Sequence, residues 1–439
     1  MHYSNKIFLG VTEIAGYYAG LQKGLCELGY QCNHYLYFSH PFKYSQPSRS
    51  LLCNIIRMLI QLHNRLSHKN HFFELLKLLL FPSRLIFQAL FFFSCIFKFD
   101  IFIFGYCTSF FSPLPKIFSC FEFSELYLLK LLGRKIIFVM HGSDVRPPYM
   151  DGTYQGVDIK TFVSLNKERK KRITRLEKLA NYIVCDPAYA AYFTKSVINR
   201  SYIMCPASVI YKADDILQRT DNKAPFSIVH APSAPSLKGT LEIQKAIQNL
   251  KRQGYRIRYT EIINQSNQKV IETILSSDMV IDQLYSDIPL PGLASESALL
   301  GRAVVMGIYD QKFVLGQIDA KARPPVCYVY PESIEEELLK ILKKGRHFIF
   351  KQGKKLQKFA YQNITPLVVA KRFELIFENR IPGKWWYNPN AYDYIFGCVI
   401  TKKRLFSNIK KIINEFGISA LQMNDKPQYL KKLLSRLKN

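Results

Sequence analysis

The sequence lacks the cysteine and histidine patterns that hold a structural metal. It contains ten cysteines, but none of them forms a C-x-x-C pair and no histidine cluster accompanies them. This absence argues against a zinc site, and we expect no metal ion in the protein. The chain also shows no export signal, so the scattered cysteines are interpreted as free thiols in a reducing cytosol.

Long hydrophobic runs are missing as well. The first apolar stretch, Ile7–Gly10, is too short for a signal peptide and is typical of a first strand. Leu85–Phe97 has only Gln88 and Ser94 as polar residues, but it is too short to span a bilayer. The segment can either lie in a membrane interface beside basic residues or pack as a buried helix on the first sheet.

Acidic residues are scarce. The 33 Asp and Glu residues stand against 61 Lys and Arg residues, which gives a formal net charge of +28. This imbalance favours anionic partners, which include nucleic acid, phospholipid and sugar phosphates. The 32 Phe and 27 Tyr residues fit a protein that works at a membrane surface.

Neither short internal repeats nor low-complexity tracts interrupt the chain, and its 439 residues are enough for two domains. Short apolar strands alternate with helical patterns in both halves, which predicts an α/β protein with two doubly wound, Rossmann-like parallel sheets that face each other across a cleft. We expect an N-terminal domain over residues 1–210, with a basic, apolar helical insertion at about 50–97. A second domain is expected over 211–378, with the linker near Met204–Asn222.

Residues 379–439 are expected to form a basic C-terminal extension. Thr401–Asn439 is rich in Lys and Arg, and both tryptophans of the chain precede it at Trp385 and Trp386. Tryptophans beside basic residues are typical of an interfacial membrane anchor, while the alternative is a solvated basic appendage.

Two strand-to-helix loops in the second half, called crossings here, carry side chains of opposite charge. In Ile228–Thr240, a strand ends in a Pro/Ser loop, and Lys238 with Gly239 then opens a helix. Downstream, a strand ends at Asp282, and a Gly/Pro loop leads to Glu296 at an expected helix start. A nucleoside diphosphate requires both features, because its phosphates need a cation and free helix N–H groups while its ribose needs a hydrogen-bond acceptor.

In these segments the chain resembles the retaining glycosyltransferases of family 4, which have the GT-B fold, and in particular those of bacterial surface polysaccharide (capsule and lipopolysaccharide) synthesis. The family carries a "PS…KGT" segment after a strand and later an "E-A-hydrophobic-A-x-G-K-P-V" segment. Here these read Pro232–Thr240 and Glu296–Val305. The resemblance covers about Ile7 to Glu378, without Ser50–Leu80.

The resemblance implies roles for two loops of the first half. Gly10 and Gly16 would bring backbone close to the donor diphosphate or the acceptor, although each can also serve a simple turn. His141, at a strand end, would contact the donor sugar or support the leaving phosphate. Asp144 and Arg146 follow it and can instead pair with each other.

In the second half, Lys238 would neutralise the departing diphosphate, with Ser233 and Gly239 beside it. Where the family often has an Arg three residues before this Lys, the chain has Pro235. Glu296 would hold the ribose hydroxyls, which is compatible with its favourable charge at a helix start.

The first glutamate of the family's pair falls on Ile288, so the neighbouring Asp287 is the candidate substitute. The N–H of Gly292 and its neighbours can contact the donor sugar.

The predicted function is transfer of a sugar from a nucleoside diphosphate sugar to a lipid-linked or surface glycan, with anomeric retention, in the cytoplasm at the inner face of the plasma membrane. No Asp-x-Asp loop follows a strand, so no metal and no cofactor besides the donor are expected, and an anionic membrane surface is the expected partner. One alternative is a catalytically degenerate GT-B protein that binds nucleotide sugar or acts as a scaffold subunit. The other is a basic nucleic-acid-binding protein, although no nucleic-acid-binding motif supports it.

Overall fold

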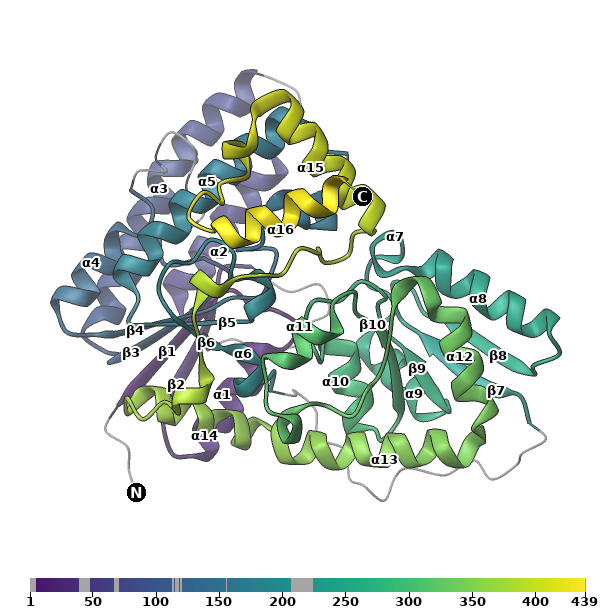
Figure 1. Ribbon diagram of the computed structural model, residues 1–439. Coiled ribbons are helices and arrows are strands. Elements are labelled where there is room, and N and C mark those ends of the chain that lie inside the picture. The colour runs from purple at the N-terminus through teal and green to yellow at the C-terminus, as the bar shows by residue number, and fades with distance from the viewer. Residues whose placement is uncertain are drawn as a thin grey trace.

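The computed structural model shows two α/β domains, each built around one sheet (Figure 1). The described residues are 5–38, 48–66, 71–112, 114, 118, 121–154, 156–206 and 224–438, with only the backbone described for 71–79. Both sheets are parallel apart from one added edge strand, and helices alternate with strands along the chain. The fold class predicted from the alternation is confirmed.

The N-terminal sheet has the order β12-β6-β5-β4-β3-β1-β2. Its strands are β1 (Lys6–Val11), β2 (Gln31–Leu36), β3 (Ile101–Gly105), β4 (Lys135–Val139), β5 (Tyr182–Cys185), β6 (Val197–Asn199) and β12 (Trp386–Tyr387). The central strands are apolar on both faces: Phe8 packs into the core on one side, and Ile7 and Leu9 pack into the core on the other. Two-sided burial explains why these strands read as continuous apolar runs.

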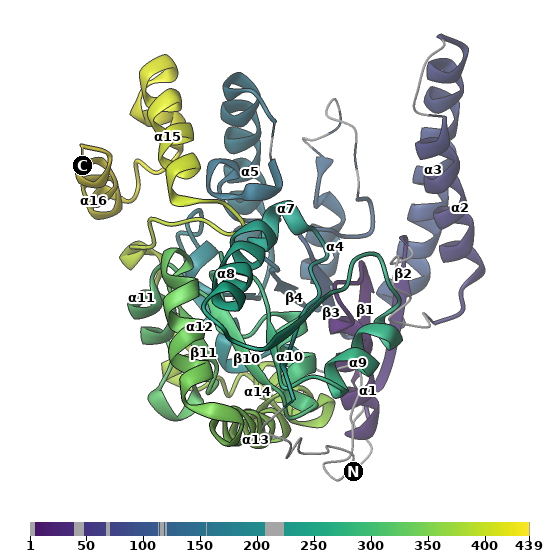
Figure 2. The same ribbon diagram turned by 90° about the vertical axis from the view of Figure 1, so that its right-hand side faces the viewer.

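Helices cover both faces of this sheet. They are α1 (Tyr17–Glu27), α2 (Leu51–Arg65), α3 (His71–Ile96), α4 (Ser124–Leu131), α5 (Ile159–Leu179) and α6 (Arg200–Ile203). The side chains of Ser50 and Asp158 accept backbone N–H groups at the starts of α2 and α5, which sets where these helices begin. The predicted helical insertion is therefore the α2–α3 pair, which stands out from the sheet in Figure 2.

The C-terminal sheet has the order β11-β10-β9-β7-β8, all parallel. Its strands are β7 (Phe226–His230), β8 (Ile257–Glu261), β9 (Met279–Ile281), β10 (Ala303–Gly307) and β11 (Cys327–Val329). Its helices are α7 (Pro235–Lys238), α8 (Thr240–Arg252), α9 (Asn267–Leu275), α10 (Gly292–Leu299), α11 (Gln311–Gly316), α12 (Ile334–Lys343) and α13 (Gly345–Asn363). Short 3-10 turns complete the chain at Pro148–Met150, Gly152–Tyr154, Pro187–Tyr189, Ala320–Ala322, Pro331–Ser333, Gly383–Trp385, Pro389–Ala391 and Ile418–Leu421.

The end of the chain returns to the N-terminal domain. Helix α14 (Pro366–Phe377) packs on α1, and the close fit leaves the backbone of Pro366 where a side chain on Gly24 would be. Strand β12 then pairs antiparallel with β6. Residues that were assigned to the second domain and to a separate extension therefore complete the first domain.

The final helices, α15 (Lys402–Phe416) and α16 (Pro427–Lys438), lie over α5 (Figure 1). Their apolar faces are buried in the main core of the N-terminal domain, through residues such as Leu405, Ile409 and Leu433. Trp385 is buried and stacks on Tyr202, with 6.2 Å between the ring centroids. The expected basic extension is thus an integral, packed part of the domain, and Trp385 is not an exposed anchor.

The expected linker near Met204–Asn222 falls largely on residues 207–223, which lie outside the described part of the chain. The predicted boundary between the two domains, at residues 210 and 211, thus stays a prediction. No helix within the described ranges combines the length and the hydropathy that crossing a membrane requires.

Candidate functional site

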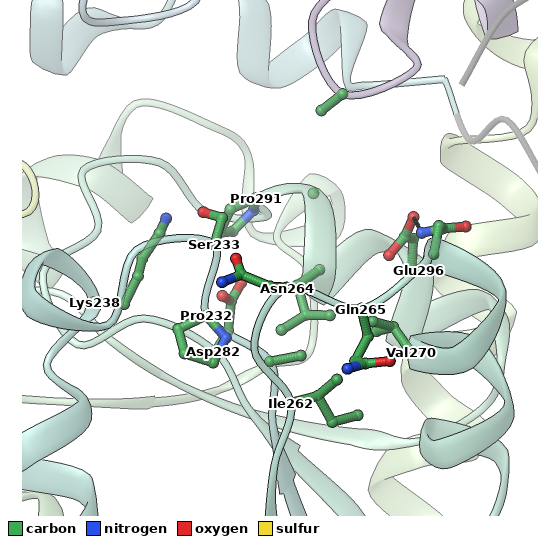
Figure 3. A pocket seen from close by; sticks show the side chains of 15 residues that line it. Pro232, Ser233, Lys238, Ile262, Asn264, Gln265, Val270, Asp282, Pro291 and Glu296 are labelled. Atoms are coloured by element: carbon green, nitrogen blue, oxygen red, sulfur yellow. Dashed lines mark hydrogen bonds between the residues drawn. The ribbon is translucent and has the colours of Figure 1, made fainter. Parts of the chain in front are cut away.

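A cavity of about 320 Å³ opens at the carboxyl ends of β7, β8 and β9 (Figure 3). These three strands are neighbours in the C-terminal sheet, so the loops that follow them converge on one edge. The cavity is lined by Ala15, Ala231, Pro232, Ser233, Lys238, Ile262, Asn264, Gln265, Asn267, Val270, Asp282, Pro291, Gly292, Leu293 and Glu296. Ala15 comes from the N-terminal domain, so both domains contribute to the cavity.

Four of the predicted binding residues line this cavity: Ser233, Lys238, Gly292 and Glu296. In Figure 3, Lys238 lies at one side and Glu296 at the opposite side, with Asp282 between them. The structure thus brings together the cation and the carboxylate that the two crossings offer. These residues are far apart in the sequence, and their meeting follows from the adjacency of β7 and β9.

Lys238 is held by the loop that follows β9. Its ammonium donates a hydrogen bond to the side-chain oxygen of Gln283, and its carbonyl accepts the N–H of Leu284 at 3.1 Å. The next residue, Gly239, has a φ of 79° and lies so close to Leu284 that a Cβ would be 2.8 Å from that side chain. Gly239 therefore serves the tight turn between α7 and α8 and fixes the position of Lys238.

His230, at the end of β7, is a buried residue that connects the elements around the cavity. It is buried, and its Nδ1 lies 2.9 Å from the carbonyl of Ile281 while its Nε2 lies 2.9 Å from the hydroxyl of Thr240. Burial lowers the pKa of His230, so the ring is neutral, donates from Nδ1 to the carbonyl and accepts from the hydroxyl. The ring thereby joins the ends of β7 and β9 to the start of α8.

Asp282 is the buried acidic group of the cavity. It is 5% exposed, and its Oδ2 has no hydrogen-bond partner among the described residues. Burial raises the pKa of Asp282, while Lys238 and the N–H of Ala294 at the start of α10 oppose the rise. A buried oxygen without a partner, facing a polar cavity, is suited to a hydrogen bond from a ligand.

Glu296 lies one turn inside α10, not at the helix start that the sequence suggested, because α10 already begins at Gly292. Its Oε1 accepts a hydrogen bond from Asn267 at 2.8 Å. Burial raises its pKa to about 7, against the lowering effect of Asn267, and Asp282 adds to the rise. The two carboxyl groups of the cavity thus influence each other's charge.

The first strand and loop are arranged differently from the expectation. Gly10 lies inside β1, where a Cβ would be 2.9 Å from the carbonyl of Tyr35, and it does not line the cavity. Gly16 precedes α1 with a φ of 80°, and the nearby Glu13 accepts the N–H groups of Tyr18 at 3.2 Å and Ala19 at 3.0 Å.

The remaining N–H groups of the first turn of α1, on Tyr17 and Gly20, bond the carbonyls of Ile14 and Gly16. The start of α1 is therefore saturated by the protein itself. Ala15 of the same loop lines the cavity, so the predicted approach of the Gly16 backbone to the donor diphosphate or the acceptor stays a prediction.

His141 does not line the cavity either. Its Nε2 is 2.8 Å from the hydroxyl of Tyr18, and its N–H donates to Asp144 at 3.0 Å. Burial lowers the pKa of His141 well below its ordinary value, with Arg200 acting in the same direction. The ring is thus a neutral group that links β4 to α1.

Asp287 belongs to a buried ion pair between the two domains. It is 2% exposed, and its Oδ2 accepts hydrogen bonds from Arg146 at 2.9 Å and 2.6 Å. Arg146 also pairs with Asp151 at 3.1 Å. Asp287 is therefore not placed to act on a ligand in the cavity, and Arg146 is not available to replace the cation missing at Pro235. Nor do Asp144 and Arg146 pair with each other as a staple.

Sequence reasoning missed Asn264, Gln265 and Asn267, which line the cavity after β8, and it did not assign a role to Asp282. Only their positions could have identified these residues from the sequence, because each follows a strand, β8 or β9, that pairs with β7. Across the described ranges there is no group of three or more His, Cys, Asp and Glu residues arranged to hold a metal ion.

No protein-family model and no curated protein sequence matches the chain. Among solved structures it is similar to the trehalose-6-phosphate synthase OtsA, with a TM-score of 0.50, 9% identity, and coverage of 86% of this chain and 100% of that one. It is also similar to the catalytic domain of starch synthase IV from Arabidopsis thaliana bound to ADP and acarbose, with a TM-score of 0.48, 12% identity and coverage of 86% and 99%. Anabaena HepE in complex with UDP-glucose gives a TM-score of 0.46, 11% identity and coverage of 85% and 99%. The chain has the GT-B fold of these enzymes.

Proposed function

We propose that the protein is a glycosyltransferase that takes a sugar from a nucleoside diphosphate sugar. The observation that carries the proposal is the cavity at the ends of β7 and β9, where Lys238 faces Glu296 with Asp282 between them. The cation suits the diphosphate, and the carboxyl groups suit the hydroxyls of ribose or sugar. A cavity of about 320 Å³ is within the usual range for small-molecule sites.

In the proposed reaction the bond between the donor's anomeric carbon and its phosphate oxygen breaks, and the electron pair leaves on the diphosphate. The acceptor oxygen attacks the same face of the sugar, and its proton passes to the departing phosphate, which retains the anomeric configuration. Lys238 stabilises the charge that grows on the leaving group. The route needs no enzyme nucleophile, which agrees with Asp287 being held by Arg146.

Binding of the donor is tested by thermal unfolding with a panel of nucleoside diphosphates and their sugar derivatives. A ligand at about a hundred times its dissociation constant should add about 2.7 kcal/mol to the free energy of unfolding. Lys238→Ala should reduce the shift, and Lys245→Ala, on the neighbouring helix α8, serves as the control because Lys245 does not line the cavity. The proposal is wrong if no nucleotide of the panel stabilises the protein.

A catalytically inactive, nucleotide-sugar-binding or scaffold subunit is the second candidate, favoured by Pro235 and Ile288 at positions where the resembling family carries charge. Both candidates predict donor binding. Release of nucleoside diphosphate from the stabilising donor, with water or glycan as acceptor, separates them, since the inactive subunit would bind without turnover.

We further propose that the protein attaches to an anionic membrane surface and there serves a glycan or lipid-linked acceptor. The α2–α3 pair carries this proposal, since each helix exposes apolar residues at helical spacing. These are Leu51, Met58 and Leu62 on α2 and Ile86, Leu90 and Phe93 on α3, with Phe97 directly after α3. Basic side chains such as Lys98 lie beside them, which fits a surface of anionic lipid.

The C-terminal helices are poor anchors by comparison, because their apolar faces are buried. Sedimentation with vesicles that contain phosphatidylglycerol tests the surface. We expect Leu90→Glu with Phe93→Glu to abolish binding, whereas Leu241→Glu, at a more exposed apolar position on α8, should leave it unchanged. Protein that stays in the supernatant at low salt would contradict the membrane proposal.

A further inference from the structure

A second, larger cavity lies in the N-terminal domain and has no role in the donor site. Its volume is about 730 Å³. It opens at the carboxyl ends of β3 and β4, where Tyr106, Ser143 and Asp144 line it, and α5 forms its opposite wall. The carboxyl ends of parallel strands are where open α/β sheets bind their ligands.

The wall that α5 provides is basic. It carries four cations, Arg169, Lys171, Arg172 and Arg175, against one carboxylate, Glu168, and Glu122 also lines the cavity. Arg172 is neutralised by Glu122, with 2.7 Å between their charged atoms, and it also donates to the carbonyl of Cys107. We expect an anionic ligand to depend on Arg169 and Lys171.

Arg169 is only partly exposed, yet its hydrogen bonds go to neutral groups. It donates to the carbonyl of Arg146 and to the hydroxyl of Tyr154. Among the described residues no carboxylate lies within ion-pair distance of its guanidinium. Burial raises the pKa of Asp144, and the charge of Arg169 counters that rise without forming an ion pair. A partly buried cation that lacks a direct ion pair at the edge of a polar cavity is stabilised when an anion enters. Lys171 adds an exposed cation on the same wall.

The floor of the cavity can recognise hydroxyl groups. Asp144 is 6% exposed, and its Oδ1 is engaged by the N–H groups of His141 and Gly142 at 3.0 Å and 2.8 Å. Its Oδ2 is buried and has no partner in the described part of the chain. The hydroxyls of Tyr106 and Ser143, 2.9 Å apart, lie beside it. Such a combination of polar groups below a basic wall fits a sugar that carries an anionic substituent.

We propose that this cavity, the α5 cavity, binds an acidic acceptor, namely a sugar or glycan that carries a phosphate or a carboxylate. That the bound sugar is an acceptor rests on the proposed function. Binding of an anion in the α5 cavity does not depend on that function. The phosphate or carboxylate would pair with Arg169 and Lys171, while the sugar hydroxyls would meet Asp144 and its neighbours. The α5 cavity lies in the N-terminal domain, and the donor cavity lies mainly in the C-terminal domain, so donor and acceptor would occupy separate sites.

The test measures binding of three probes to the full-length protein by calorimetry or ligand-observed NMR: glucose, glucose 6-phosphate and glucuronate. We expect at least one of the two acidic sugars to bind at least tenfold more tightly than glucose, since hydrogen bonds to charged groups are among the strongest available. The two acidic probes distinguish a phosphate from a carboxylate.

Two variants locate the binding. Lys171→Glu should weaken binding of the acidic sugar at least tenfold, and Arg169→Gln should do the same. Lys167→Ala removes an exposed charge from the same helix outside the cavity and should have no effect. Because Lys171 is exposed, its variant should keep the melting temperature, so that a loss of binding is not a loss of fold.

The inference is overturned if the three sugars bind equally, or if neither acidic sugar binds. It is also overturned if Lys171→Glu and Arg169→Gln leave the preference intact, or if Lys238→Ala abolishes it, because the anion would then sit in the donor cavity. If only the proposed function is wrong, the acidic sugar still binds in the α5 cavity, but no nucleotide stabilises the protein.

Discussion

Replacing Glu296 by Gln should make the free protein more stable at alkaline pH and should change its stability by less than about 1 kcal/mol at pH 5. Burial raises the pKa of Glu296 from 4.5 to about 7, so the folded protein holds a proton that the unfolded chain has released. A raised carboxyl pKa contributes stability that is fully present below pH 4.5 and is lost as the pH rises through about 7.

The size of the effect follows from the shift. A difference between 4.5 and about 7, at 1.36 kcal/mol per unit, corresponds to about 3 kcal/mol well above pH 7. Gln keeps the shape of the side chain and the acceptor for Asn267, and it cannot ionise. At pH 8.5 the variant should therefore be more stable than the native protein by about 2 to 3 kcal/mol.

Urea unfolding at pH 5, 7 and 8.5 without nucleotide measures this difference. Glu272→Gln, the same change at an exposed position on α9, is the matched control and should show little dependence on pH. If the native protein and Glu296→Gln differ by the same amount at pH 5 and 8.5, Glu296 does not titrate near 7 in the folded state, and the reasoning from its burial fails.

Three further changes test other parts of the structure. Lys238→Ala should lower kcat on the order of 10²-fold or more, because charge grows on the leaving group, whereas Glu296→Gln should mainly raise KM for the donor. Steady-state kinetics measures both parameters, and equal changes of kcat and KM in both variants would contradict these roles. Arg146→Met should lower the free energy of unfolding by about 3 to 5 kcal/mol, because it leaves Asp151 and Asp287 buried without their cation. Urea unfolding measures this change, and a decrease below about 1 kcal/mol would show that these ion pairs are not buried in solution. Truncation after Thr401 should lower the melting temperature markedly, since α15 and α16 supply core residues such as Leu405 and Leu433; an unchanged melting temperature would mean that these helices do not pack as described.

Local pattern was sufficient for most of the framework. The first apolar stretch, Ile7–Gly10, lies within β1, as its pattern suggested. The alternation of strands and helices predicted both parallel sheets, because strand and helix leave different periods in the sequence. The donor cavity was also within reach, since Lys238, Asp282 and Glu296 all follow strands whose carboxyl ends must meet at one edge of a parallel sheet.

The departures come from contacts between residues that are distant in the chain. Asp287 looked like a free carboxylate beside Ile288, but Arg146 from the other domain pairs with it. The C-terminal helices looked like a basic surface tail, because a basic amphipathic helix has the same pattern whether its apolar face meets lipid or protein.

The sequence by itself thus determined which segments become strands and helices and which strand ends carry charge, because these depend on neighbours along the chain. Only the tertiary structure decided which charges are available to a ligand. Availability depends on burial and on partners, and these come from distant segments. Arg146 pairs with Asp287, and burial, with Asn267 and Asp282, sets the charge of Glu296. The approach of α5 to the ends of β3 and β4 leaves Arg169 without an ion pair among the described residues.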